Sequence, residues 1–344
     1  MYHKPLITVM IIAYKRKEFI LDAIKSVLQQ TINKQDFEII VVKNFVDEDI
    51  DSYISSYQIK SIMSEEITLL GKILEGTSIS LGYFISILED DDKFKIDKLC
   101  EIKEAYECNP DLVYIHNNYD LINQDGKIIT KKSNNFGSEY IIRSDILKPK
   151  KVNFCINHGY HNNSCITIRR SILISNMTFL RDLKSNNWVD LSLLFVSLSY
   201  IQLHSENYHL LITNKILTEY RVHKSLSSFI PQDSKQFVSS GMEIGLKELK
   251  LIEGFSNRDD GPLSYYTRSF LQIESVLFSI LDPLNHNLSK VNRLKLVLHI
   301  LFTKYKVMSK RSIRIIIISM MSLLVGERLI RAILISLLKN GKSI

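Results

Sequence analysis

The chain has 344 residues, of which 45% are apolar and 24% are charged, and its net charge is +7 at neutral pH. This length buries one large core and a smaller one, and the low glycine and proline counts exclude collagen-like and low-complexity structure. The four cysteines form no CxxC pair and no zinc-type spacing with histidine, which indicates reduced thiols in a reducing compartment. No signal peptide is expected, because the apolar run at residues 6–12 is short and leads straight into Lys15, Arg16 and Lys17.

The charge is unevenly distributed along the chain. Residues 289–344 contain twelve lysines or arginines and one acid, Glu327, whereas residues 1–288 contain 32 basic and 36 acidic residues. A mildly acidic body therefore carries a strongly basic tail. We expect the tail, and not the body, to meet an anionic surface.

Strand and helix patterns alternate along the first third of the chain. Apolar runs typical of strands lie at residues 6–13, 37–42, 59–63, 83–88 and 112–116. Between them, apolar residues recur at helical spacing in residues 19–28, 50–57, 69–79 and 93–108. This alternation predicts an α/β fold with a doubly wound, mostly parallel sheet.

The pattern changes after residue 116. Residues 123–126 predict a turn between two short strands, and residues 130–163 are irregular and polar, as in a mobile binding loop. Structure resumes with residues 166–174, a helix over 189–200, and short apolar runs at 208–212 and 216–220. Beyond residue 229 the chain has a helical pattern, which predicts one domain over residues 1–228 and a helical C-terminal region over 229–344.

Four consecutive acids, Glu89 to Asp92, follow directly after the apolar run at residues 83–88. By itself such a run is more often a solvated loop or the start of a helix. At the end of a buried strand, however, the four carboxylates repel one another and need a counter-charge. A divalent metal bound through oxygen is one such counter-charge, and ligands of open α/β sheets gather at the carboxyl ends of strands.

Four motifs in this order resemble glycosyltransferase family 2, whose catalytic domains have the GT-A fold. Residues 8–16 and 24–31 resemble the family's amino terminus, and residues 37–42 its second strand. Gly71, Lys72 and Gly76 stand at its nucleotide-facing segment, and the acidic tetrad stands at its metal-binding DxD motif. The resemblance covers roughly residues 5–228 and implies a Rossmann-like, mostly parallel GT-A domain.

The resemblance implies a divalent metal, Mn²⁺ or Mg²⁺, that stabilises the leaving diphosphate of a nucleoside-diphosphate sugar. Asp91 is the expected direct ligand. Glu89 stands where an aspartate is usual, and Asp92 and His223 are further candidate ligands. In the alternative assignment, Asp90 or Asp92 contacts the sugar or ribose.

The resemblance also implies a set of donor contacts. They are Ala13, Tyr14, Arg16, Asn44, Gly71, Lys72, Asp90 and Arg221. Tyr14 resembles the family's base-stacking tyrosine, and Lys72 is expected to neutralise the diphosphate or contact the base. Lys43 and Asn44 stand where the family usually presents two aspartates, so Asn44 is expected to hydrogen-bond a base edge without a charge.

The resemblance also implies a general base for an inverting transfer at the start of a helix late in the domain, which in this sequence lies near residue 190. Asp190 is the first candidate and Asp182 the reserve, although an aspartate at a helix N-terminus is often only a cap. His158 and His161 are interpreted as residues of the acceptor loop, because no third ligand for zinc lies nearby in the sequence.

The basic tail predicts a membrane-surface anchor. Residues 311–338 contain two apolar runs separated by Glu327, Arg328 and Arg331, whereas a spanning helix needs about 20 apolar residues without such breaks. An in-plane amphipathic helix on an anionic leaflet fits better. A helical subdomain packed on the core, or a dimer interface, stays open. A nucleic-acid partner is not expected, because few aromatic rings are available for base stacking.

These features together predict a metal-assisted, inverting glycosyltransferase. It is expected to move a sugar from a nucleoside-diphosphate sugar to a glycan or lipid-linked acceptor. It would work in the cytoplasm, peripherally bound to the cytoplasmic face of the membrane through residues 289–344. The alternative is a membrane-docked module that binds the nucleotide sugar without catalysis.

Overall fold

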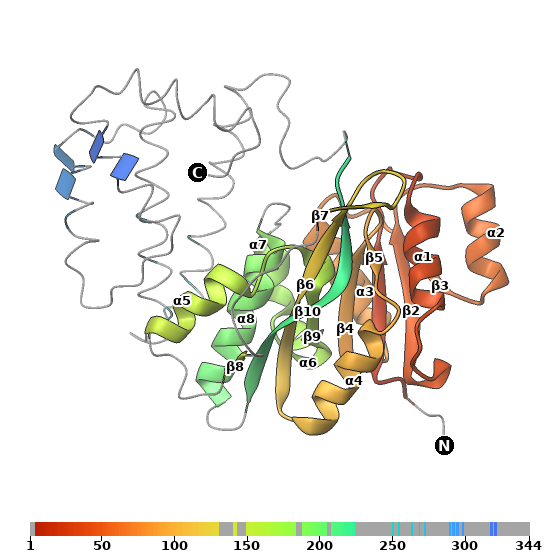
Figure 1. The fold of residues 1–344 in the computed structure, drawn as a ribbon, viewed down its shortest axis with the longest axis horizontal. Helices are drawn as coiled ribbons and strands as arrows, with labels where there is room; N and C mark the ends of the chain where they lie inside the picture. The colour runs from red at the N-terminus through yellow and green to blue at the C-terminus, as the bar shows by residue number, and fades with distance from the viewer. Residues whose placement is uncertain are drawn as a thin grey trace. The chain divides into compact units, whose positions relative to one another are not determined.

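The computed structural model describes residues 4–130, 140–142, 149–183, 188–204 and 208–223, together with isolated residues between 250 and 321 (Figure 1). The chain divides into two compact units, Met1–Asp145 with His158–Lys224 and Ile146–Asn157 with Ser225–Ile344. The predicted domain boundary at residue 228 lies outside the described residues. The division into residues 1–228 and 229–344 therefore stays a prediction.

The first unit is built on one sheet. In the described residues it has ten strands in the order β3-β2-β1-β4-β9-β6-β10-β5, with β7 on β6 and β8 on β10. β1 to β4 pair in parallel, as do β6 and β10, while β9 runs antiparallel to β4 and β6. The strands are β1 Ile7–Ile12, β2 Phe37–Lys43, β3 Lys60–Met63, β4 Phe84–Glu89, β5 Lys93–Phe94, β6 Leu112–Ile122, β7 Ile128–Thr130, β8 Tyr140–Ile142, β9 Ile166–Arg169 and β10 His209–Arg221. The predicted α/β class with a mostly parallel sheet is confirmed.

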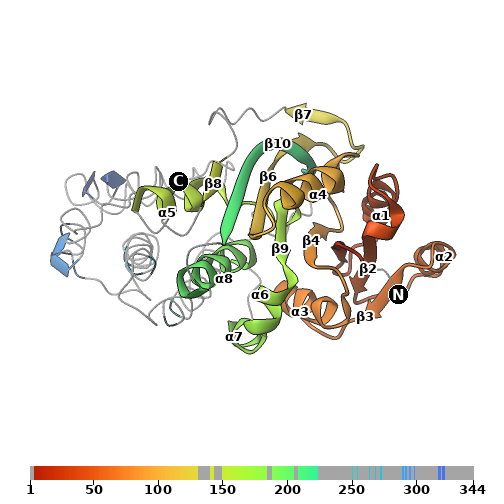
Figure 2. The same ribbon diagram turned by 90° about the horizontal axis from the view of Figure 1, so that it is seen from below.

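Helices cover both faces of this sheet. Figure 2 shows α1 and α4 on one face and α3, α6, α7 and α8 on the other. The helices are α1 Ile20–Leu28, α2 Glu48–Ser56, α3 Leu69–Ile79, α4 Lys98–Cys108, α6 Arg170–Ser175, α7 Met177–Leu183 and α8 Val189–His204, with 3₁₀ turns η1 Lys34–Asp36 and η3 Asn163–Cys165. The predicted doubly wound arrangement follows from this placement.

β1 shows why the strands have unbroken apolar sequences. Val9 and Ile11 belong to the core that also contains Ile24 of α1 and Ile102 of α4. Met10, between them, faces the other layer, because a Cβ added at Gly76 of α3 would lie 2.7 Å from its sulfur. Both faces of the strand are buried, and so every position along it is apolar or small.

Two local predictions are wrong, and two predicted apolar runs form one strand. The helix predicted over residues 93–108 begins only at Lys98, because Lys93–Phe94 pair as β5 with β10. The apolar runs at 208–212 and 216–220 form a single strand, β10, with irregular register between them. The irregular stretch at 130–163 contains the helix α5 (Pro149–His158), and η3 begins at its last residue. The helix prediction at residues 93–97 failed because β10, the strand that pairs with Lys93–Phe94, is distant in sequence.

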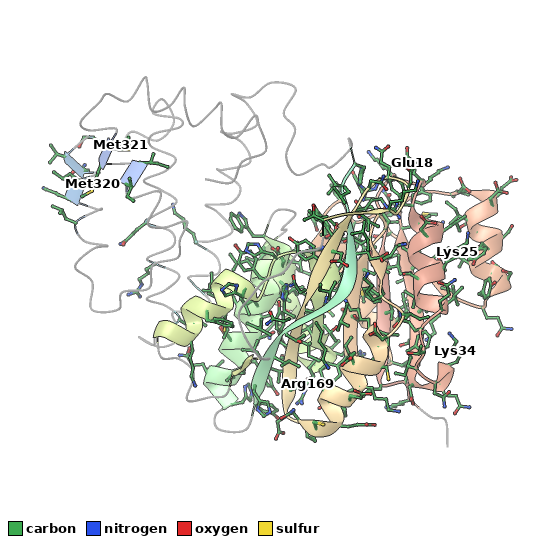
Figure 3. All side chains as sticks on the ribbon, viewed as in Figure 1. Glu18, Lys25, Lys34, Arg169, Met320 and Met321 are labelled. Atoms are coloured by element: carbon green, nitrogen blue, oxygen red, sulfur yellow. The ribbon has the colours of Figure 1, made fainter. Side chains whose placement is uncertain are left out.

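The register places the ends of three strands side by side. Ile12 at the end of β1 is paired with Val42 of β2 and with Glu89 of β4. The segments that follow these strands therefore meet at one end of the sheet. Glu18, in the loop after β1, lies at this end, whereas Lys34, shortly before β2, lies at the opposite end (Figure 3).

The second unit is described only in part. It contains α5 up to Asn157 and the isolated helical residues between 250 and 321. Among the described residues, no helix combines the length and the apolar character that a membrane crossing requires. The predicted in-plane anchor over residues 289–344 lies largely outside the described residues and stays a prediction.

Candidate functional site

The acidic tetrad forms the turn that follows β4. Glu89 ends the strand, and the amide of Asp90 donates to the carbonyl of Ile12 at 3.1 Å, which ties the turn to β1. The amide of Asp92 donates back to the carbonyl of Glu89 at 3.2 Å. This turn buries Asp90, Asp91 and Asp92, whose exposed fractions are 3%, 4% and 1%. Three buried carboxylates in succession require positive partners.

The loop after β1 supplies the first partner. Arg16 Nη2 donates to Asp90 Oδ1 and lies 2.7 Å from Asp91 Oδ2, so one nitrogen is shared by two carboxylates. Burial disfavours the charged guanidinium, but the hydrogen bond to Asp90 and the charges of Asp91 and Asp90 outweigh it and raise the pKa of Arg16. The loop reaches this position through Lys15, whose φ of 59° is left-handed and whose amide donates to Asn44 Oδ1 at 2.8 Å.

His223 provides a second contact from the end of the sheet, two residues after β10. Its Nε2 lies 2.9 Å from Asp91 Oδ2 and 3.3 Å from Arg16 Nη1. Its ring packs on Phe19 with centroids 5.3 Å apart, and only 6% of the residue is exposed. Residues 207 positions apart in the sequence therefore meet over the carboxylate of Asp91.

The segment around η3 holds the other two acids. Asn163 Nδ2 donates to Glu89 Oε1 at 2.8 Å, and Asn162 Nδ2 donates to Asp92 Oδ2 at 3.3 Å. Asn162 has a left-handed φ of 73°, a conformation that asparagine tolerates better than most residues. The hydroxyl of Ser164 accepts the amide of Glu89 at 3.0 Å. Sequence reasoning missed this segment, because polar residues in an irregular stretch carry no sign of their partners.

Burial dominates the protonation of Glu89, Asp90 and Asp92. It raises the pKa of Glu89 to about 7, with the charge of Asp91 adding to the shift and the hydrogen bond from Asn163 opposing it. Burial also raises the pKa of Asp90 to about 6, although Arg16 pulls it down. The pKa of Asp92 is raised well above its usual range by burial and by Asp91. These three buried carboxyls therefore hold their protons to higher pH than exposed carboxyls do.

Arg221, the last residue of β10, is fully buried beneath the tetrad. Its Nε donates to the carbonyl of Asp91 at 2.8 Å, and its Nη1 donates to the carbonyl of Gln124 in the β6–β7 turn at 2.5 Å. Nη2 pairs with Asp22 of α1 at 3.1 Å, and the guanidinium lies 4.4 Å above the ring of Phe19. The predicted phosphate contact stays a prediction, since protein oxygens occupy the guanidinium in this arrangement.

The predicted base-binding residues lie beside the cluster. Tyr14 follows β1 and is 45% exposed, as a stacking platform requires. Lys72 of α3 lies with its ammonium 4.6 Å from the centre of the Tyr14 ring and donates to the carbonyl of Glu66. Burial lowers the pKa of Lys72. The amide of Gly71 is capped by Thr68 at 3.0 Å, and Ala13 is buried with its amide on Val42.

At the end of β2, Lys43 and Asn44 stand where family 2 usually presents two aspartates, and the structure shows what Lys43 contacts. It is 3% exposed, and its ammonium pairs with Asp51 of α2 at 2.8 Å and donates to the carbonyl of Phe45 at 2.6 Å. Lys43 is therefore held by α2 and the loop after β2. Asn44 is partly exposed, and its side-chain oxygen receives the amide of Lys15, which leaves its nitrogen as the group for a base edge.

The predicted metal ligands come together without forming a metal site in this arrangement. Asp91 Oδ2 is already within hydrogen-bond distance of both Arg16 and His223, and both oxygens of Asp92 accept N–H groups, from Arg221 and Asn162. Over the described ranges, no three His, Cys, Asp or Glu side chains are placed to hold an ion. The donor set does not fit a divalent ion while Arg16 is on Asp91, so the metal roles stay predictions.

The two predicted general bases lie on the helices after β9. Asp190 is in the first turn of α8, is partly exposed, and accepts its neighbour's amide at 2.8 Å. Asp182 is exposed on α7. Neither is paired with the tetrad in the described structure, and both roles stay predictions. His161 contributes its backbone carbonyl to His116 at 2.9 Å.

The comparisons with known proteins agree with this geometry. Residues 8–174 match the family described as Glycosyl transferase family 2. A protein described as an uncharacterized glycosyltransferase from Rickettsia felis is 28% identical over 144 residues, which are 40% of this chain and 23% of that protein. The match thus covers less than a quarter of that relative's length.

Solved structures share the fold. The crystal structure of S. aureus TarS 1-349 has a TM-score of 0.56 at 12% identity and covers 97% of this chain and 90% of that chain. The structure of TarS 1-349 in complex with UDP-GlcNAc has a TM-score of 0.55 at 11% identity, with the same coverage. At these identities the likeness establishes the fold alone. Residues 8–174 are thus similar to glycosyl transferase family 2, and the unit built around the acidic tetrad shares the fold of these solved structures.

Proposed function

We propose that the protein is a nucleotide-sugar-dependent glycosyltransferase that transfers a sugar to a glycan or lipid-linked acceptor. One observation supports this most strongly: a buried carboxylate–arginine–histidine cluster lies next to the exposed ring of Tyr14 at the end of β1 and β4. A ring and a charged cluster suit the base and the diphosphate of one donor. That TarS 1-349 has been crystallised with UDP-GlcNAc supports a nucleotide sugar as the ligand class.

The chain's own residues explain how a leaving diphosphate would be stabilised. Charge on the leaving group grows as the glycosidic bond breaks, so fixed donors at that position lower the barrier. Arg16 brings a guanidinium with a raised pKa, and His223 brings a ring held by Asp91.

Donor turnover tests this proposal directly. We expect the full-length protein to release nucleoside diphosphate from one member of a panel of UDP-, GDP-, CDP- and dTDP-sugars, with and without Mn²⁺. Asp91→Asn should reduce the rate by at least about a hundredfold, because it removes the charge shared by Arg16 and His223. The matched control is Asp49→Asn on the exposed side of α2, which should leave the rate unchanged. Full activity of Asp91→Asn would contradict the proposal. Tight donor binding without turnover would favour a binding module.

The acceptor base is proposed to be Asp190. A single-displacement transfer needs a carboxylate that removes the acceptor hydroxyl's proton, and α8 presents Asp190 in its first turn, partly exposed. Asp190→Asn should lower kcat while leaving the KM for the donor nearly unchanged, whereas Asp182→Asn should change neither. The anomeric configuration of the product, read by NMR, tests inversion. Equal effects of the two substitutions would remove Asp190 from this role.

Membrane attachment through residues 289–344 is proposed from their charge and apolar pattern. The site of action would then be the cytoplasmic face of the membrane. The full chain should co-sediment with vesicles containing anionic lipid and not with neutral vesicles. Chains in which Arg328 and Arg331 are replaced by glutamine should bind less tightly, by about 1 kcal/mol for each charge removed. Unchanged sedimentation of these variants would contradict the assignment.

A further inference from the structure

Arg16 differs from the other positive groups of the described site in its partners and in its exposure. Arg221 is committed to the carbonyls of Asp91 and Gln124 and to Asp22, and Lys72 lies against Glu66 and the Tyr14 ring. Arg16 instead reaches two aspartates with one nitrogen, and its side chain is 22% exposed. It therefore combines direct pairing to the tetrad with access from solvent.

The pairing around Arg16 is also incomplete. In the described part of the chain, Arg16 Nε and Asp90 Oδ2 are both buried and have no hydrogen-bond partner. A buried donor without a partner costs about 1–3 kcal/mol, so the arrangement is stable only because the ion pairs offset that cost. Nε itself is enclosed, so a diphosphate oxygen would meet the guanidinium through the part of the side chain that is exposed, and the planar fork is suited to bind an oxyanion there.

We propose that Arg16 is the resident counter-cation of the tetrad: it competes with divalent cations for Asp90 and Asp91 and binds the diphosphate of the donor. The diphosphate part of this inference rests on the proposed function, whereas the competition part does not. The role differs from that of Arg221, which ties strands and turn together from beneath the tetrad.

The competition follows from the geometry at Asp91. Its Oδ2 lies 2.7 Å from Arg16 Nη2 and 2.9 Å from His223 Nε2, so a cation that binds this oxygen must displace the guanidinium. Removing Arg16 would leave Asp91 and His223 as an oxygen and a nitrogen ligand on the same side of the site. It would also remove the nearest positive charge, which repels an incoming divalent ion. Divalent ions should therefore bind more tightly without Arg16.

Calorimetry on the full-length protein tests both parts. The variants are Arg16→Gln and, as matched control, Lys17→Gln. Lys17 is the next residue along the chain and pairs with Asp47 at 3.0 Å, so this control also removes one positive charge from the same loop. Mn²⁺ alone should bind Arg16→Gln at least about tenfold more tightly than the wild type, a difference of about 1.4 kcal/mol. Lys17→Gln should match the wild type. Thermal unfolding of all three proteins verifies that each is folded.

The second titration uses UDP in the presence of a chelator. The wild type and Lys17→Gln should bind UDP under these conditions, and Arg16→Gln should bind it at least about tenfold more weakly. Arg16→Lys should recover part of the loss, since it keeps the charge but not the fork. Mn²⁺ affinity that is equal or lower in Arg16→Gln would overturn the competition. UDP affinity that does not depend on Arg16 would overturn the diphosphate contact. Because the Mn²⁺ titration uses no donor, its result stands whether or not the protein proves to be a transferase.

Discussion

We expect the role of Arg221 to be structural, so that its loss lowers the free energy of unfolding of the first unit. It is the last residue of β10, is fully buried, and joins the tetrad, the β6–β7 turn and α1 through one guanidinium. Arg221→Met removes the charge and the donors while keeping an unbranched apolar chain against Phe19. Of the acceptors that it leaves behind, the carbonyl of Asn123 keeps a hydrogen bond from the amide of Gly126 at 3.0 Å.

The expected cost follows from the contacts that are lost. Three carbonyls lose a charged donor, those of Asp91 at 2.8 Å, Asn123 at 3.3 Å and Gln124 at 2.5 Å, and such bonds are worth about 1.5–3 kcal/mol each. The pair with Asp22 adds little, because that carboxylate is half exposed. The bonds share one side chain and are not additive, so we expect a loss of about 3–5 kcal/mol, as for other broken buried pairs.

Thermal unfolding of the full-length variant measures this cost. A domain of this size shifts by about 2–4 °C per kcal/mol, so Arg221→Met should melt about 10 °C below the wild type. Arg181→Met on α7 is the matched control, because Arg181 is exposed, and it should melt within about 2 °C of the wild type. If Arg221→Met melts with the control but loses UDP affinity, then Arg221 is a ligand contact and the structural reasoning is refuted.

Two further predictions concern buried positions in the same domain. Lys98 is fully buried, donates to Ser164 and Thr218, and burial lowers its pKa to about 7. Between pH 7 and 9 the unfolded chain binds a proton there that the folded chain has released, so the wild type should gain stability relative to Lys98→Met as the pH rises, by up to about 1.4 kcal/mol per unit. Urea unfolding at several pH values measures this, and a slope no different from that of the exposed control Lys127→Met would contradict it. Gly82→Ala should destabilise the domain by about 1–3 kcal/mol, because its Cβ would lie under 3.0 Å from the backbone nitrogen of Thr8, which cannot move without disturbing β1. Gly76→Ala meets the flexible end of Met10 at 2.7 Å and the side chain of Val42 at 3.1 Å, and no backbone atom is among these nearest contacts, so it should cost less; the reverse order in urea midpoints would refute this reasoning.

Local sequence was sufficient for the elements that have an unambiguous apolar pattern. The strands β1, β2 and β4 and the helices α1 and α3 lie within one or two residues of their predicted bounds. Each has an apolar pattern that fits only one period, and each is flanked by polar or small residues. The resemblance to family 2 rests on these same segments, so the fold and the similarity to that family could be read from the chain.

Local sequence failed where a partner elsewhere in the chain decides the conformation. Lys93 and Phe94 lie in a helical pattern, yet they form β5 because Glu219 and Thr218 of β10 pair with them. Asn162 and Asn163 look like loop residues, yet they donate to Asp92 and Glu89. A period or a propensity describes neighbours along the chain and contains no information about such contacts.

The acidic tetrad depends on both local sequence and tertiary structure. The sequence by itself determined that four acids follow a buried strand and therefore need positive charge nearby. The tertiary structure alone decided that Arg16 supplies this charge and that His223, 207 residues further along the chain, closes over the same carboxylate. Repulsion among carboxylates is a property of adjacent residues. The choice of counter-charge depends on which strand ends, with the segments that follow them, the sheet brings together.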